Sequence, residues 1–135
     1  MALEASMKIA ASGMKVQGDR MRVISENLAN ADSLARTPGG DPYRRQVATF
    51  ENVMNEEMGV QQVQIDEIET DQSDFQKEYR PGHPAANEDG YVKTPNVKSL
   101  VETADMREAQ RSYQANLKVI ENSRSMMQEL VSLLR

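Results

Sequence analysis

Apolar residues recur every three or four positions at both ends of the chain, and this pattern constrains the fold most. The N-terminal series is Leu3, Met7, Ala10, Met14, Gln17, Met21, Ile24, Leu28 and Ala31. Alternating steps of four and three are typical of a heptad seam, in which one helix packs against another. The pattern predicts a helix over residues 1–32. Gly13 and Gly18 each weaken it by about 1 kcal/mol relative to alanine, so this helix is not expected to persist alone.

A second series with the same spacing lies at the other end of the chain. Its members are Met106, Ala109, Tyr113, Asn116, Ile120, Ser123, Met127, Leu130 and Leu134. Neither glycine nor proline occurs after Asn96, so nothing in this segment interrupts a helix. The pattern predicts one helix from about Ser99 to Leu134 within a C-terminal segment 97–135. Its length is on the order of 50 Å.

Residues 33–96, between the two predicted helices, carry the signals of short strands. Apolar and polar residues alternate there, although imperfectly, which favours an extended chain. The candidates are YRRQVATFE at 43–51, VQQVQIDEIE at 60–69 and, more weakly, DFQKEY at 74–79.

Two stretches of the same segment predict loops, because proline and glycine interrupt regular structure. RTPGGDP at 36–42 holds two of each. RPGHPAANEDGYVKTP at 80–95 is predicted as loop and turn throughout, with its tightest turn at 87–90.

These elements predict an α+β fold. Long N- and C-terminal helices pair as a coiled-coil-like antiparallel pair, and a small β-rich domain is inserted between them. The 135 residues suit one small domain, but only 39% are apolar and 4% aromatic, with no Trp. Since large rings dominate core energetics, an isolated monomer is expected to have a thin core. A subunit that completes its burial in an assembly tolerates such a composition.

Charge and hydropathy exclude several classes of protein. The chain has 16 basic and 21 acidic residues and a net charge of −5, which argues against a nucleic-acid partner. No stretch approaches the ~20 apolar residues of a membrane span, so membrane insertion is not expected. The N-terminus lacks the ~7–15-residue apolar block of a cleavable signal peptide. Cysteine is absent, which removes disulfides and Cys-based zinc sites.

Catalytic signals are weak. His83 is the only histidine and lies between prolines, so a structural role in a loop is the favoured interpretation. The acidic run lacks the ligand spacing of a calcium loop, and a solvated strand edge with its turn is the better interpretation. Its members are Asp66, Glu67, Glu69, Asp71 and Asp74. We expect no cofactor, no metal and no tight divalent-cation binding. A small metal-dependent hydrolase using His83 and this run remains a less favoured alternative.

Several ordered motifs resemble one protein family. SENLANADS at 25–33 resembles the asparagine-rich motif that closes the N-terminal helix of bacterial flagellar axial proteins of the rod, hook and hook-associated types. RPGHPAANEDGYVKTPNV and the later REAQRSYQANLKVIENSRSMM are similar to rod members of this family. The resemblance covers both ends, PYRRQ and the segment from Tyr79 onward. Only residues of about 51–74 look idiosyncratic, and Glu26 departs from the usual amide or small residue.

The resemblance implies a non-enzymatic, helically assembling subunit of the proximal rod in the flagellar basal body. Such a subunit transmits torque across the periplasm and lines the export channel with its paired helices. It implies export without cleavage through the flagellar type III apparatus. The implied partners are copies of itself, other proximal rod subunits of the FlgB and FlgF types, and a FliE-type adaptor. A rod-like subunit of another secretion machine, or a different axial protein, is the main alternative.

The two asparagines of SENLANADS are candidates for contacts between subunits. Asn27 lies beside the seam at Leu28, and its amide can donate and accept at once, so it could bridge to a neighbour's backbone. Asn30 is expected to end the helix in the left-handed conformation. The alternative is that both only cap and solvate the helix end. The predicted subunit-interface residues are Leu3, Met7, Met14, Met21, Ile24, Asn27, Leu28, Asn30, Tyr113, Asn116, Ile120, Met127, Leu130 and Leu134.

Overall fold

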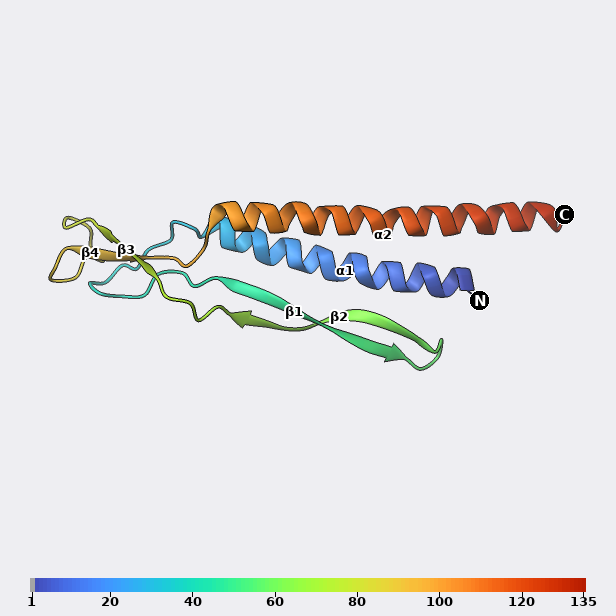
Figure 1. Cartoon of the computed structure of the whole chain (residues 1–135), viewed down its shortest axis with the longest axis horizontal. Helices are drawn as coiled ribbons and strands as arrows, with labels where there is room; N and C mark the ends of the chain where they lie inside the picture. The colour runs from blue at the N-terminus through green and yellow to red at the C-terminus, as the bar shows by residue number, and fades with distance from the viewer. Residues whose placement is uncertain (1) are drawn as a thin grey trace. The chain divides into compact units, whose positions relative to one another are not determined.

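The computed structural model describes residues 2–135, so Met1, the first residue of the predicted N-terminal segment, lies outside the described residues. Two helices begin and end the described chain, with four short strands between them (Figure 1). The elements are α1 (Ala2–Ala29), β1 (Gln46–Asn55), β2 (Val60–Thr70), β3 (Gln76–Tyr79), β4 (Tyr91–Thr94) and α2 (Ser99–Leu133). The strands form two separate two-stranded sheets, β1–β2 and β3–β4.

The chain divides into two compact units, and each contains part of both helices. The first unit comprises the chain up to Met21, Ala48–Glu67 and Arg107–Arg135. The second comprises Arg22–Val47 and Ile68–Met106. Within each unit the two helices run antiparallel.

In the first unit α1 lies between α2 and the β1–β2 hairpin (Figure 1). The two helices pack closely at Gly13, where an added Cβ would lie 2.6 Å from Nδ2 of Asn116. On the other side of α1, the backbone N–H of Val63 donates to Oγ of Ser12 at 3.4 Å. The buried apolar side chains of this unit are small, namely Ala10, Val16 and Ala109. This core is thin, as the composition predicts.

In the second unit β3 and β4 pair antiparallel, with Gln76 opposite Thr94 and Tyr79 opposite Tyr91. The rings of Tyr79 and Tyr91 meet edge to face, with their centroids 5.3 Å apart. Gly90 precedes β4 with a φ of +84°, and an added Cβ would lie 2.9 Å from the Tyr79 ring. Only glycine combines this backbone conformation with this close approach.

The predicted α+β fold and antiparallel helix pair are confirmed, and β1, β2 and β3 correspond to the three candidate strands. The predicted turn at 87–90 is also confirmed, because the N–H of Gly90 donates to the carbonyl of Asn87 at 3.0 Å. Among residues 2–135, neither helix is long and apolar enough to cross a membrane.

The prediction of loop and turn throughout 80–95 is wrong, because β4 lies within it. Four residues between Gly90 and Pro95 are too few to show alternation. This strand exists because it pairs with β3 and because Val92 is buried, 1% exposed. Both causes depend on residues distant in the sequence.

Candidate functional site

Asn27, near the end of α1, lies at the centre of a polar cluster in the second unit. Its Nδ2 donates to the carbonyl of Gln46 at 2.8 Å and to Oε2 of Glu102 at 3.2 Å. Its Oδ1 accepts the hydroxyl of Tyr43 at 2.7 Å and the N–H of Gln46 at 3.0 Å. The side chain therefore uses two donor and two acceptor positions inside the subunit, which is the full capacity of an amide.

Arg45 is the cation of this cluster and contacts three carboxylates. Its Nε donates to Oε1 of Glu102, a residue of α2 that is 0% exposed. Its Nη1 lies 3.3 Å from Oδ2 of Asp71, and its Nη2 lies 3.5 Å from Oδ2 of Asp105. A buried carboxylate needs such a charged and hydrogen-bonded partner, because desolvation otherwise disfavours its ionised form. The guanidinium thus compensates the buried charge at the start of α2.

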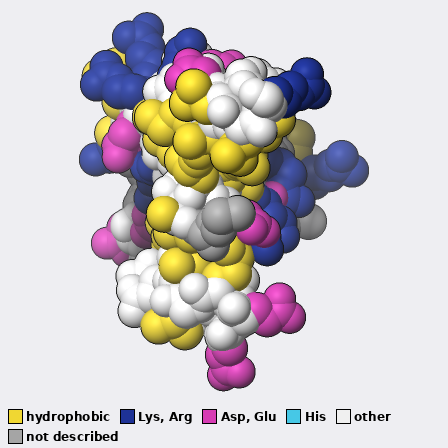
Figure 2. Space-filling model, turned by 90° about the vertical axis from the view of Figure 1, so that its right-hand side faces the viewer, with side chains coloured by type: hydrophobic (Ala, Val, Ile, Leu, Met, Phe, Trp, Pro, Cys, Tyr) yellow, Lys and Arg dark blue, Asp and Glu magenta, His cyan; other side chains and the backbone are white. Residues whose placement is uncertain are grey.

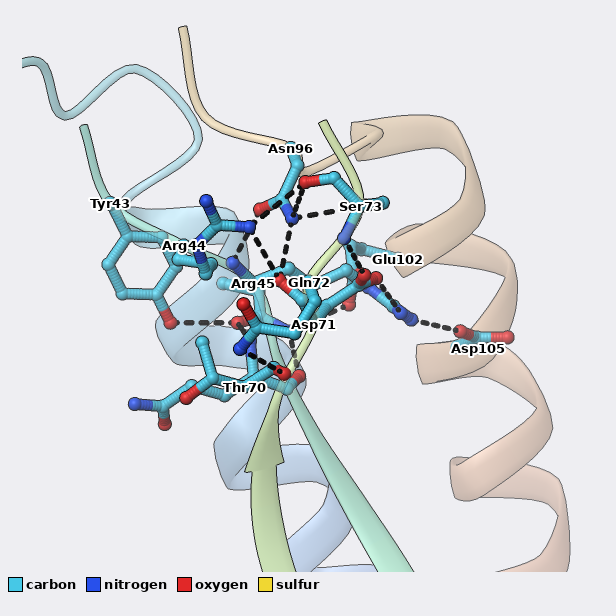
Figure 3. Close-up of polar contacts among 12 residues, drawn as sticks. Tyr43, Arg44, Arg45, Thr70, Asp71, Gln72, Ser73, Asn96, Glu102 and Asp105 are labelled. Carbon is cyan, nitrogen blue, oxygen red and sulfur yellow. Dashed lines mark hydrogen bonds and ion pairs between the residues drawn. The ribbon is translucent and has the colours of Figure 1, made fainter. Parts of the chain in front are cut away.

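The strand ends are tied to the same cluster by backbone and amide contacts (Figure 3). The N–H of Asp71 donates to the carbonyl of Arg45 at 2.8 Å, and the N–H of Arg45 donates to Oδ1 of Asn96 at 2.7 Å. Nδ2 of Asn96 donates to the carbonyl of Asp71 at 3.0 Å and to the carbonyl of Ser73 at 3.2 Å. We call Asn27, Tyr43, Arg45, Asp71, Asn96 and Glu102 the polar cluster.

These surroundings shift three pKa values. Burial raises the pKa of Tyr43, and the charges of Glu26 and Glu102 raise it further. Burial alone would lower the pKa of Arg45, but its hydrogen bond to Glu102 and the nearby acidic charges raise it above the ordinary value. The pKa of Asp71 is lowered, mainly by the hydrogen bond from the backbone N–H of Ser73 and then by the Ser73 side chain, with a smaller contribution from Arg45. The cluster therefore holds a neutral tyrosine beside ionised arginine and aspartate.

The structure corrects the expectations for both asparagines of SENLANADS. Asn27 has no hydrogen-bonding capacity left for a neighbouring subunit and is 1% exposed, so we remove it from the predicted interface. Asn30 follows the last residue of α1, as expected, but no non-glycine residue within 2–135 has a positive φ. It ends the helix through its side chain instead, donating to the carbonyl of Glu26 at 2.8 Å and accepting from Ser33.

The other predicted interface residues differ widely in exposure. Ile24 is buried in the core of the second unit, and Asn116 packs against Gly13 in the first. Partly exposed positions are Leu3, Met7, Met14, Met21, Leu28, Tyr113 and Ile120. The exposed positions are Met127, Leu130 and Leu134, at the end of α2.

An apolar groove lies where α2 ends and α1 begins, within the first unit. It measures about 470 Å³ and is lined mainly by leucine, valine and methionine. Hydrophobic side chains gather at this end of the molecule (Figure 2). Leu130 is 52% exposed, Leu133 80% and Leu134 87%. Clusters of large exposed apolar residues are typical of interaction surfaces.

Among residues 2–135, the side chains of the alternative chemical site do not come together. Nδ1 of His83 accepts the N–H of Ala85 at 3.0 Å, which is the structural loop role that its sequence context predicts. Within residues 2–135, no three His, Asp or Glu side chains come together as ligands for a metal ion. Asp71 follows the last residue of β2 and pairs with Arg45, so it is not the freely solvated carboxylate that the sequence predicts.

Arg45 and Glu102 are not among the site residues that the sequence predicts. A signal for Glu102 is present, since it precedes Met106 by four residues and so extends the C-terminal apolar series by one step. A carboxylate at a seam position needs a buried partner. The identity of that partner, however, depends on the path of the chain through β1.

Comparisons with known proteins point to one kind of protein. The model of the family described as flagellar basal body rod FlgEFG protein C-terminal matches residues 88–133. The chain is 50% identical over 133 residues to the flagellar basal-body rod protein FlgC of Agrobacterium fabrum, covering 98% of this chain and 96% of the relative. It is 37% identical to FlgC of Salmonella typhimurium, covering 98% of each chain. It is 34% identical to FlgC of Bacillus subtilis, covering 95% of each.

Proposed function

The chain belongs to the family of the flagellar basal-body rod protein FlgC, and we propose that it forms the proximal part of the rod by helical assembly. It is a structural subunit of the flagellar basal-body rod. In the proposed role its terminal helices line the export channel and transmit torque through packed apolar seams. The observation that supports this most directly is the uncovered apolar end of α2 beside the start of α1.

Assembly with other flagellar rod components follows from membership of this family. We propose that these are copies of the chain itself, FlgB- and FlgF-type subunits and a FliE-type adaptor. The proposed location is the part of the rod in the periplasm, reached through the flagellar type III export apparatus without cleavage. We also propose that the chain catalyses no reaction, because its relatives are named as rod proteins and His83 has a structural hydrogen bond.

The decisive variant carries Leu130→Asp and Leu134→Asp. Both side chains are exposed in the single subunit, so aspartate is accommodated there without unfolding. In the assembled rod the same carboxylates would be buried without a partner, at a cost of several kcal/mol each. We expect a stable, exported chain that is absent from purified basal bodies.

The measurement is the amount of the variant in cells, in the exported fraction and in purified basal bodies. Gln128→Asp, an exposed change on another face of α2, is the matched control and should assemble normally. Normal rods from the double variant would contradict the proposed seam. Degradation of the double variant inside the cell would also contradict it, because the leucines would then support the fold of the monomer.

A further inference from the structure

The outer face of α2 in the first unit carries basic side chains that no other part of the described chain covers. Arg107, Arg111 and Lys118 are separated by four and seven residues, so they form one stripe along the helix. At about 100° per residue, this stripe lies opposite Ala109 and Asn116, which face α1. All three basic residues are exposed. We call them the basic stripe.

Most of the positive charge of this stripe is not neutralised within the subunit. Lys118 lies 3.3 Å from Glu121, one turn further along the same helix, and both side chains are well exposed. Among the described residues, Arg107 and Arg111 form no ion pair with an acidic side chain. Two adjacent guanidinium groups about 6 Å apart along a helix are well suited to bind carboxylates.

The β1–β2 hairpin has the opposite charge. No Lys or Arg occurs between Arg45 and Lys77. The turn that joins the two strands presents Glu56 and Glu57 side by side, and both are exposed. Oδ1 of Asn55 caps this turn by accepting the N–H groups of Glu57 and Met58. Among the described residues, neither the Glu56 nor the Glu57 carboxylate has a partner within the subunit.

The hairpin cannot reach the basic stripe of its own subunit. Within the first unit it contacts α1 through Val63 and Ser12, and α1 contacts α2 through Gly13 and Asn116. Figure 1 draws α2 on one side of α1 and the hairpin on the other, so the hairpin is separated by α1 from the outer face of α2 that carries the stripe. In the end view of Figure 2, acidic side chains project at the lower edge, where the hairpin lies. Only another molecule can bring these two surfaces together.

We propose that the hairpin turn of one copy, through Glu56 and Glu57, docks on Arg107 and Arg111 of a second copy. The contact joins two different surfaces, so each subunit keeps one surface free for the next neighbour. A head-to-tail contact of this kind builds open helical arrays. The proposal rests on the proposed rod function and identifies copies of the same chain as one partner. Complementary charge at such a contact sets register and speeds docking.

A charge exchange between the two surfaces tests the proposal. The stripe variant carries Arg107→Glu and Arg111→Glu, and the hairpin variant carries Glu56→Lys and Glu57→Lys. Each alone should reduce incorporation into purified basal bodies about tenfold at equal cellular level. The variant with all four changes should restore incorporation, because opposite charges face each other again. Glu88→Lys with Asp89→Lys, exposed changes away from both surfaces, is the control and should incorporate normally.

Cross-linking gives a measurement that does not depend on charge. The chain has no cysteine, so Glu57→Cys with Arg111→Cys introduces the sole thiols. Oxidation of intact basal bodies should yield dimers and larger multimers of this chain, and neither single-cysteine variant should do so. Normal incorporation of both charge-reversed variants, or cross-linking only to a protein of another size, would overturn the proposal. Absence of the unaltered chain from basal bodies would instead overturn the proposed function.

Discussion

At the scale of single residues, Asn27 connects parts of the chain that are far apart in sequence. Its amide joins α1 to the start of β1, to Tyr43 in the preceding loop and to Glu102 in α2. The Asn27 amide cannot turn towards water, because the residue is only 1% exposed. Losing one member of such a network leaves the others unsatisfied.

Asn27→Ala should lower the free energy of unfolding by about 3 kcal/mol, because a buried carboxylate oxygen and backbone groups lose partners. Asn30→Ala is the matched control and should cost about 1 kcal/mol, since it removes only a local cap beside Ser33. Denaturant unfolding followed by circular dichroism measures both. Equal losses in the two variants would show that the network contributes nothing beyond helix capping.

The lowered pKa of Asp71 predicts a dependence of stability on pH. Its carboxyl is held ionised by Ser73 and Arg45 in the folded state, whereas the unfolded chain titrates near the ordinary value of 3.8. A depressed folded pKa contributes stability that is present above 3.8 and is lost as the pH falls through the folded value. The difference in unfolding free energy between the wild type and Asp71→Asn should therefore shrink below pH 3.8. A difference that stays constant down to pH 2 would contradict this assignment.

At the scale of elements, the helices depend on close packing more than on large apolar side chains. Gly13 allows α1 and α2 to approach, and the space that a Cβ would need is filled by the amide of Asn116. In the second unit, β3 and β4 hold together through four residue pairs, one of which is the Tyr79–Tyr91 ring contact. Gly13 and Asn116 have poor intrinsic helix propensity, so tertiary packing supports the helices at this contact.

Gly13→Ala should destabilise the helix pair, although alanine is the better helix former, because its Cβ would lie 2.6 Å from Asn116. We expect a loss of about 1–2 kcal/mol, typical of overpacking. Gly18→Ala is the matched control, since nothing lies within 4 Å of its added Cβ, and it should stabilise the protein slightly. Adding Asn116→Ala to Gly13→Ala should recover part of the loss. Stabilisation by Gly13→Ala alone would show that α1 and α2 do not approach there.

At the scale of the whole molecule, the two units bury their apolar surface unequally. Of the seventeen large hydrophobic side chains that are exposed among residues 2–135, twelve lie in the first unit and five in the second. The first unit also contains the apolar groove and the thin core of alanine and valine. Apolar surface left in water contributes nothing to stability, so the first unit has more to gain from the proposed contacts with neighbours than the second.

The purified chain should therefore be mostly monomeric and partly disordered in dilute solution, and hydrogen exchange measures this. Amides at the start of α1 and in the last turns of α2 should exchange quickly, because few buried contacts hold them. Amides of β3, of β4 and of Arg45, the residue before β1, should be protected more strongly, since the polar cluster and Val92 hold them. Strong protection of both chain ends in a dilute monomer would contradict this prediction.

The sequence by itself determined the two helices, three of the four strands, the α+β class and the flagellar family. Helical periodicity is a local property, and motifs in order along the chain identify relatives without any coordinates. Only the tertiary structure decided that β4 exists, that Asn27 faces inward, and that Arg45 compensates Glu102. Asn27 bonds to residues 19 and 75 positions away, and such pairs are chosen by the path of the chain. An amide that can bond to a neighbouring subunit can bond equally well within its own, and burial against β1 and α2 decides between them.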